Sequence, residues 1–171
     1  IIGLGLIGGS LAKALKEKVG VKPFCGVDND ENTLRKAIRD GTIRHGSKDL
    51  SITQGCDILF ICVPVNSIFG VLEDLSSFYC GIVTDCANTK AGIYSKVSAE
   101  YPEMKYVGGN PMISSEKSGY DASRASLFEN SPYIICSSKD RHENNIIGDI
   151  IKAIGAQPVF MTPNEHDKFV A

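Results

Sequence analysis

Three glycines near the start of the chain, Gly3, Gly5 and Gly8, have the spacing of a turn that binds a dinucleotide. In such a turn the first glycine permits a tight bend, the second lets the backbone approach a pyrophosphate, and the third lets a helix pack closely on the preceding strand. The N–H groups at the start of the following helix then point at the phosphates, where the helix dipole favours negative charge, and Leu6 and Ile7 within the turn are further candidate cofactor-binding residues. Because glycine-rich turns without a ligand share this spacing, the sequence of the neighbouring segments is needed to distinguish a dinucleotide site from an ordinary turn.

An acidic residue follows at the expected distance. Residues 24–28 have the composition of a second strand, and its last residue, Asp28, lies twenty positions after Gly8. A carboxylate there accepts a hydrogen bond from a ribose 2′-hydroxyl and repels a 2′-phosphate. No arginine follows directly, since the next residues are Asn29 and Asp30. The sequence therefore predicts NAD rather than NADP as cofactor, with Asp30 capping a helix that begins near Glu31.

Apolar runs alternate with amphipathic stretches along the rest of the chain. Helices are predicted over 11–18, 67–75, 91–99 and 144–154, and further strands over 58–62, 81–85, 105–108, 133–136 and 157–161. Gly155 is suited to end the helix that precedes it. Continuous apolar strands separated by helices indicate a sheet covered on both faces. The predicted fold class is α/β, a Rossmann-type doubly wound, mostly parallel sheet with helices on both faces.

In such a sheet, ligands bind beyond the carboxyl ends of the strands, so the loops that follow the strands are the candidate site. The loop after the strand at 58–62 is expected to contact the cofactor with Val63, Pro64 and Val65. The next loop carries Asp85, a candidate cofactor contact or helix cap, and Lys90, which either binds an anion or pairs with Asp85. Residues 109–119 have the polar, small-residue composition of a substrate loop, although a solvated connection has the same composition.

Composition excludes several classes of function. The chain has 171 residues, 43% of them hydrophobic, and a formal net charge of −2 with a pI near 5.9, which gives no electrostatic footprint for nucleic acid. The longest apolar runs are far shorter than a membrane span. None of the six cysteines forms a Cys-x-x-Cys pair, so neither a disulfide framework nor a metal site is expected. Cysteines in apolar runs are typical of a cytoplasmic protein.

Six motifs together resemble the prephenate dehydrogenase family, which includes arogenate dehydrogenases. They are Gly-Leu-Gly-Leu-Ile-Gly-Gly-Ser at 3–10, Cys-Val-Pro-Val at 62–65, Thr-Asp-x-x-x-x-Lys at 84–90, Gly-Gly-x-Pro-Met-x-x-Ser-Glu-Lys-Ser-Gly at 108–119, Leu-Phe-Glu-Asn at 127–130 and Glu-His-Asp at 165–167. The resemblance covers essentially the whole chain. It implies an NAD-binding domain over 1–161 and, over 162–171, the start of a helical C-terminal domain that forms a homodimer. It also implies oxidative decarboxylation of prephenate to 4-hydroxyphenylpyruvate in tyrosine biosynthesis, with arogenate as the alternative substrate.

The resemblance also assigns site residues, and this chain departs from the family at three of them. A histidine that meets the reacting hydroxyl is replaced by Asn110, a serine that orients it by Asn88, and a glycine by Ser114. The family pattern implies that Glu116 and Asp167 support ionic contacts at the substrate entrance. The candidate catalytic residues are thus Asn110, Asn88 and His166, and the candidate substrate-loop residues are Pro111, Met112, Ser114, Ser115, Glu116 and Asp167.

The replacement of the histidine leaves two classes of function open. An asparagine amide forms hydrogen bonds but does not accept a proton near neutral pH. Loss of a general base costs about 10²–10⁴-fold in rate without abolishing binding. The chain is therefore expected to be either a dehydrogenase that is slow or uses another base, or a catalytically impaired NAD-binding relative with a sensing role.

Overall fold

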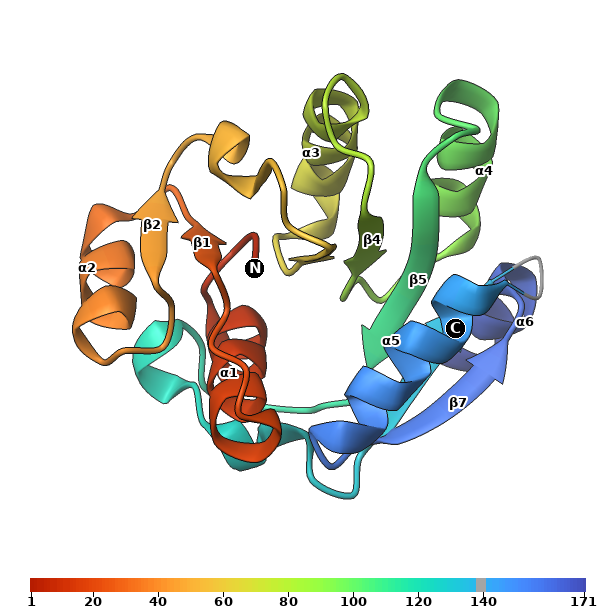
Figure 1. Cartoon of the computed structure of the whole chain (residues 1–171). Helices are drawn as coiled ribbons and strands as arrows, with labels where there is room; N and C mark the ends of the chain where they lie inside the picture. The colour runs from red at the N-terminus through yellow and green to blue at the C-terminus, as the bar shows by residue number, and fades with distance from the viewer. Residues whose placement is uncertain (138–140) are drawn as a thin grey trace.

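The computed structural model describes residues 1–137 and 141–171 as one sheet with helices packed on its two faces (Figure 1). The strands are β1 (Cys25–Val27), β2 (His45–Ser47), β3 (Ile58–Ile61), β4 (Ile82–Asp85), β5 (Lys105–Pro111), β6 (Pro132–Cys136) and β7 (Gln157–Met161). The α-helices are α1 (Leu6–Ala14), α2 (Glu31–Arg39), α3 (Val65–Ser76), α4 (Ala91–Glu100), α5 (His142–Ala153) and α6 (Pro163–Val170). Shorter helical turns are η1 (Leu15–Val19), η2 (Leu50–Thr53), η3 (Tyr120–Ala122) and η4 (Ala125–Phe128).

The first residues of the chain lie at the centre of the sheet. Ile2 pairs in parallel with Val27 of β1 on one side and with Ile61 of β3 on the other, which joins the β1–β2 pair to the five strands β3 to β7. The sheet thus extends from Ile2 to both sides, with β1 and β2 on one side and β3 to β7 on the other. The glycine turn follows Ile2 directly, so it lies at the point where the strand order reverses, which is where doubly wound sheets bind ligands.

The sheet is mostly parallel, as predicted, with one reversal. β5 and β6 pair antiparallel, with Asn110 opposite Ile134, while β6 and β7 pair parallel to each other. The chain enters β6 from a long connection that contains only short helical turns, and an antiparallel neighbour needs no crossover helix. The rule that ligands bind at the carboxyl ends therefore applies to the parallel strands β1 to β5, and not to β6 and β7, which run the other way.

Most predicted elements are present, and two boundaries differ in ways that affect the site. The first helix starts at Leu6, directly after the glycine turn, and not at Leu11. β5 continues to Pro111, so Gly109, Asn110 and Pro111 belong to a strand and not to the predicted loop. The predicted cap of α2 is confirmed, because the Asp30 side chain accepts hydrogen bonds from the backbone N–H groups of the first helical turn.

Two apolar clusters, one on each face, hold the helices against the sheet. One cluster includes residues of α1, α2 and α5, and the other includes residues of α3 and α4. Fully buried members are Leu11 and Ile147 in the first and Ile68 and Leu72 in the second. These buried contacts fix the helix ends, and with them the loops at the carboxyl edge of the sheet.

Candidate functional site

The three glycines of the first turn have three different surroundings. Gly3 has φ +86°, and a Cβ there would lie 2.7 Å from the carbonyl oxygen of Cys62. A Cβ on Gly8 would lie 1.9 Å from the carbonyl oxygen of Gly3. A Cβ on Gly5, in contrast, would meet no atom of residues 1–137 and 141–171 within 4 Å. Gly3 and Gly8 are therefore required by the fold itself, whereas the space beside Gly5 is open for something outside the chain.

The N-terminus of α1 borders this open space. Gly5 is its N-cap and supplies no side-chain hydrogen bond, and the first turn carries no acidic residue. Leu6 and Ile7 are the first two helical residues and are partly exposed. A helix end with free N–H groups and no carboxylate of its own is suited to hold an anion, which is what the glycine spacing predicts.

Asp28 lies just beyond β1 and contacts the same turn. Its Oδ2 accepts a hydrogen bond from the backbone N–H of Leu4 at 2.7 Å, and its Oδ1 accepts one from the N–H of Asp30 at 2.9 Å. A carboxylate has about four acceptor positions, so two remain for a ribose hydroxyl. The same side chain thus holds the glycine turn and is suited to recognise a sugar.

The segment after β3, for which the sequence predicts a cofactor contact, lies against the glycine turn. Val63 is 3.1 Å from the position of a Cβ on Gly3, Pro64 is the N-cap of α3, and Val65 is the first residue of α3. Cys62, just before them, lies 3.5 Å from Cys86 between their sulfur atoms. The hydrogen bond with Cys86 and burial raise the pKa of Cys62 well above its usual value, so it remains a thiol at neutral pH.

Asp85 has a structural role that replaces the predicted cofactor contact. Both Asp85 and Lys90 are completely buried, and they form an ion pair of 2.8 Å, which is the second of the two roles predicted for Lys90. Asp85 Oδ1 accepts from the Tyr106 hydroxyl and the Gly109 N–H, and its Oδ2 accepts from the Ala87 N–H. With every neighbour inside the protein, Asp85 is placed to position β5 and the following loop, and not to contact a cofactor.

Asn110 is brought against His166, which lies 56 residues later in the chain. Asn110 Nδ2 is 2.9 Å from His166 Nε2, and His166 Nδ1 is 2.7 Å from Asp167 Oδ1. His166 is completely buried, so in this arrangement it contacts Asn110 and not a bound substrate. The structure therefore places two of the candidate catalytic residues together, with His166 behind Asn110.

Asp167 joins α6 to the start of α4. Its two carboxylate oxygens accept hydrogen bonds from the backbone N–H groups of Lys90 and Ala91, both at 2.8 Å. Partial burial acts to raise the pKa of Asp167, but the hydrogen bonds from His166 and from these N–H groups outweigh it and lower the pKa. Asp167 is thus an ionised cap of α4, a role that differs from the entrance contact implied by the resemblance.

Except for Pro111, the other candidate substrate residues lie on the surface. Pro111 is buried at the end of β5, and after it the chain forms an exposed loop that contains Met112, Ser114, Ser115 and Glu116. The Ser115 hydroxyl bonds to the backbone of Lys117. Asn88 is exposed in the loop after β4, and within residues 1–137 and 141–171 it has no hydrogen bond to Asn110. The structure thus does not bring Asn88 and Asn110 together.

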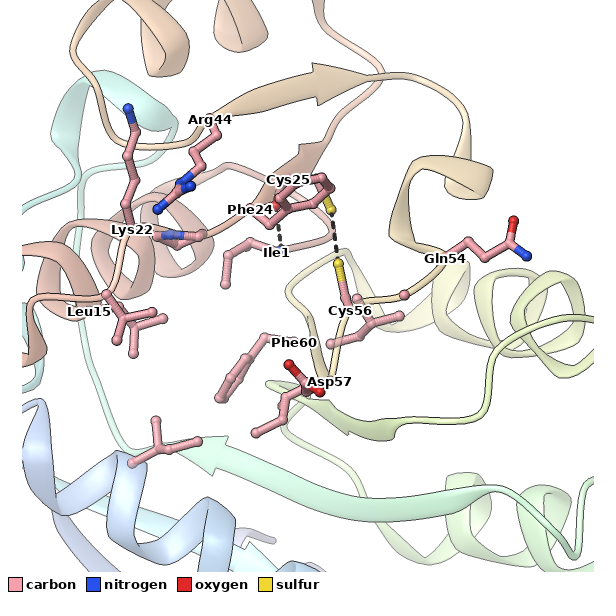
Figure 2. A pocket seen from close by; sticks show the side chains of 16 residues that line it. Ile1, Leu15, Lys22, Phe24, Cys25, Arg44, Gln54, Cys56, Asp57 and Phe60 are labelled. Carbon is pink, nitrogen blue, oxygen red and sulfur yellow. Dashed lines mark hydrogen bonds between the residues drawn. The ribbon is translucent and has the colours of Figure 1, made fainter.

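The cavity shown in Figure 2 lies at the opposite edge of the sheet. It has a volume of about 490 Å³ and is lined by residues at the amino ends of β1 and β3, among them Cys25 and Ile58. Cys25 and Cys56 face each other there, 3.7 Å apart between their sulfur atoms, and burial raises the pKa of Cys56 to about 11. Because the glycine turn and Asn110 lie at the carboxyl edge, this cavity does not belong to the candidate site.

Two tyrosines of the site were missed by sequence reasoning. Tyr106 donates to Asp85, and the Tyr133 hydroxyl lies 3.4 Å from the sulfur of Cys86. Burial raises the pKa of both hydroxyls well above the usual value, so both remain protonated donors. Each stands within an apolar strand, where an aromatic residue signals only packing, so nothing in the local sequence marks it as part of a polar network.

Comparison with known proteins gives a consistent result. Residues 11–164 match the family model described as "Prephenate dehydrogenase, nucleotide-binding domain". A prephenate dehydrogenase of Bacillus subtilis (strain 168) is 32% identical over 176 aligned residues, which cover 98% of this chain and 47% of that protein. The chain therefore spans about half the length of this curated relative.

Solved structures agree on the fold. The crystal structure of Synechocystis arogenate dehydrogenase has a TM-score of 0.89 at 30% identity, covering 99% of this chain and 61% of that one. The prephenate dehydrogenase from Aquifex aeolicus has a TM-score of 0.89 at 25% identity, covering 99% and 63%. Separately, among the described residues no helix is long and apolar enough to cross a membrane.

Proposed function

The chain belongs to the prephenate dehydrogenase family, and on that basis we propose that it is the NAD-binding domain of a dehydrogenase that acts on prephenate or arogenate. The whole protein is then an oxidoreductase of tyrosine biosynthesis. The named relatives include a prephenate dehydrogenase and an arogenate dehydrogenase, so they support the reaction class and leave the choice between the two substrates open.

The open space beside Gly5, next to the N-terminus of α1, is the observation that carries this proposal. The backbone N–H groups of a first helical turn that carries no acidic residue suit a pyrophosphate, and Asp28 suits the 2′-hydroxyl of NAD. Bound there, NAD would supply the acceptor for a hydride from the ring carbon that bears the hydroxyl. The substrate then loses its carboxylate as CO₂, and the ring becomes aromatic, so one substrate and NAD⁺ give one aromatic product, CO₂ and NADH.

Asn110 is the residue of this chain that we assign to the reacting hydroxyl. Its amide accepts a hydrogen bond from the hydroxyl as the ring carbon becomes carbonyl-like, but it does not take up the proton. His166 lies behind Asn110 and is assigned to positioning it. Without a base in contact with the hydroxyl, we expect turnover to be slower, by about 10²–10⁴-fold, than with a positioned general base.

The substitution Gly5→Ala tests the cofactor site directly. Because a Cβ at Gly5 meets no atom of the chain, the melting temperature should change little. In bound NAD the same Cβ would crowd the pyrophosphate, so affinity measured by calorimetric titration should fall by at least about tenfold. The matched variant Gly8→Ala should instead lower the melting temperature, since its Cβ would overlap the carbonyl oxygen of Gly3. Unchanged NAD affinity in Gly5→Ala would contradict the proposal.

A sensing role is the second candidate, favoured by the absence of an acid–base side chain at Asn110. The two candidates are separated by NADH production in the full-length protein with prephenate and with arogenate. Turnover with either substrate supports the dehydrogenase, whereas NAD binding without turnover supports the sensor. The dimer implied by the resemblance and the cytoplasmic location indicated by the cysteines remain predictions, and light scattering on the full-length protein checks the first.

A further inference from the structure

The side chains of Asp167, His166 and Asn110 are linked by consecutive hydrogen bonds, which connect the start of α4 to the end of β5. Asp167 contacts Nδ1 of His166 at 2.7 Å, and Nε2 of His166 contacts Nδ2 of Asn110 at 2.9 Å. His166 is completely buried and Asn110 is 5% exposed, so water does not compete freely for either contact. The orientation of each group is therefore set by its neighbours in the protein.

The carboxylate of Asp167 determines which nitrogen of His166 carries the hydrogen. Asp167 already accepts two backbone N–H groups at the start of α4, and its pKa is lowered, so it is ionised and can only accept. Nδ1 of His166 must then be the donor, and a neutral imidazole keeps its lone pair at Nε2. Two other charged residues lie near this contact, Asp85 at the end of β4 and Lys90 at the start of α4. They pair with each other at 2.8 Å.

The lone pair at Nε2 in turn fixes the amide of Asn110. A lone pair needs a donor opposite it, so the amide NH₂ of Asn110 must face His166. The second contact of this NH₂, with the sulfur of Met112 at 3.7 Å, agrees with that assignment because a thioether only accepts. The amide oxygen is the remaining polar atom of the side chain, and it is turned away from His166.

We infer that His166, held by Asp167, is a positioning residue that presents the amide oxygen of Asn110 to the reacting hydroxyl of the substrate. This inference rests on the proposed function. An amide oxygen accepts the hydroxyl hydrogen and so favours the carbonyl that forms when hydride leaves. An amide NH₂ in its place would donate to the hydroxyl oxygen and oppose that change. A free asparagine side chain can adopt both orientations, and the Asp167–His166 pair removes the unfavourable one.

Nuclear magnetic resonance on the full-length protein, labelled with ¹⁵N at histidine and asparagine, tests the arrangement without any activity. We expect the imidazole hydrogen of His166 on Nδ1, together with a coupling across the hydrogen bond from Asn110 Nδ2 to His166 Nε2. A hydrogen on Nε2 would overturn the inference, because Asn110 would then present its oxygen to His166 and its NH₂ to the substrate.

An isosteric variant provides a second test. Asn110→Asp replaces the donor by an acceptor, so His166 would lie between two carboxylates and should carry hydrogens on both nitrogens at pH 7. The matched control is Asn164→Asp, which adds the same charge on the exposed side of α6 and should leave His166 as in the wild type. Circular dichroism confirms that each variant is folded. A neutral His166 with its hydrogen on Nε2 and none on Nδ1, in folded Asn110→Asp protein, would overturn the inference.

Kinetics of the full-length protein separate positioning from a merely structural role. His166→Gln keeps an oxygen acceptor near the place of Nε2, whereas His166→Leu removes it. We expect kcat to fall about tenfold or more in His166→Leu, with KM little changed, and to be largely restored in His166→Gln. Equal kcat in both variants, with the wild type active, overturns the positioning role alone. No turnover in the wild type, despite NAD binding, overturns it together with the proposed reaction.

Discussion

At the scale of single residues, Asp28 is the residue that we propose selects between NAD and NADP. Its carboxylate has two contacts inside the protein, to the N–H groups of Leu4 and Asp30, so removing the side chain would also loosen the glycine turn. Asp28→Asn keeps an acceptor for Leu4 and removes the charge that repels a 2′-phosphate. We expect the ratio of NAD to NADP affinity, measured by calorimetric titration, to fall by about tenfold or more. Asp57→Asn, the same change at the opposite edge of the sheet, should leave the ratio unaltered, and equal ratios in both variants would refute this role.

Asn110 stands where the resemblance implies a histidine, and its contact with His166 sharpens the test of that replacement. In Asn110→His, an introduced imidazole that donates to His166 Nε2 would keep its other nitrogen free as a base. We expect the rate of NADH formation to rise toward the 10²–10⁴-fold that a positioned base supplies. A partial gain is expected, because Asn110 is nearly buried and the larger ring must displace neighbouring atoms.

The exposed position of Asn88 determines what is expected when Asn88→Ser is combined with Asn110→His. Because Asn88 and Asn110 have no hydrogen bond in the described part of the chain, Asn88→Ser alone should have little effect on the rate. In combination with Asn110→His, Asn88→Ser should change the rate by more than it does alone only if the loop after β4 closes over the bound substrate. Additive effects of the two changes would show that the loop stays open.

At the scale of elements, the buried pair of Asp85 and Lys90 holds the end of β4 to the start of α4. Lys90 Nζ also donates to the carbonyl oxygens of Ala87 and Thr89, so all three of its hydrogens have partners. Lys90→Met leaves the Asp85 carboxylate buried without its counter-charge, which should lower the free energy of unfolding by about 3–5 kcal/mol. Urea unfolding measures this change. Lys96→Met removes the exposed pair with Glu100 and should have little effect, and similar losses in both variants would contradict the argument.

Elements with a local signal were predictable from the sequence, and elements defined by distant partners were not. The glycine turn, the cap at Asp30 and β7 at 157–161 agree with the sequence because residue type and spacing determine them locally. β2 (His45–Ser47) has no apolar run and exists through pairing with β1. The extension of β5 to Pro111 depends on antiparallel pairing with β6, more than twenty residues away.

The same reason explains which parts of the site were predicted. The sequence identified Asn110, His166 and Asp167 separately, each from its motif. Their hydrogen bonds to one another, and the contact of Asp167 with the start of α4, join segments 56 and 77 residues apart. Such contacts depend on how α6 packs on α4. The spacing of apolar residues in the sequence carries no information about that packing.

At the scale of the whole molecule, the network around Asp167 joins β5, α4 and α6, so it should contribute to global stability. The pKa of Asp167 is lower in the folded chain than its usual value of 3.8, because hydrogen bonds to the carboxylate outweigh burial. Between the folded and the unfolded pKa, the unfolded chain binds more protons than the folded one, so stability rises with pH. The contribution of Asp167 is therefore fully present above about pH 5 and is lost as the pH falls through the folded value.

Comparison of the wild type with Asp167→Ala across pH tests this expectation. The variant loses the carboxylate that caps α4 and fixes His166, so at pH 7 its free energy of unfolding, measured in urea, should be lower by about 1–2 kcal/mol. Because the wild-type carboxylate becomes protonated in acid, the difference should shrink as the pH falls below about 4. Asp149→Ala, an exposed change on α5, should show a small difference that is independent of pH. A difference for Asp167→Ala that stays constant down to pH 3 would show that the carboxylate charge is not what holds α6 to α4.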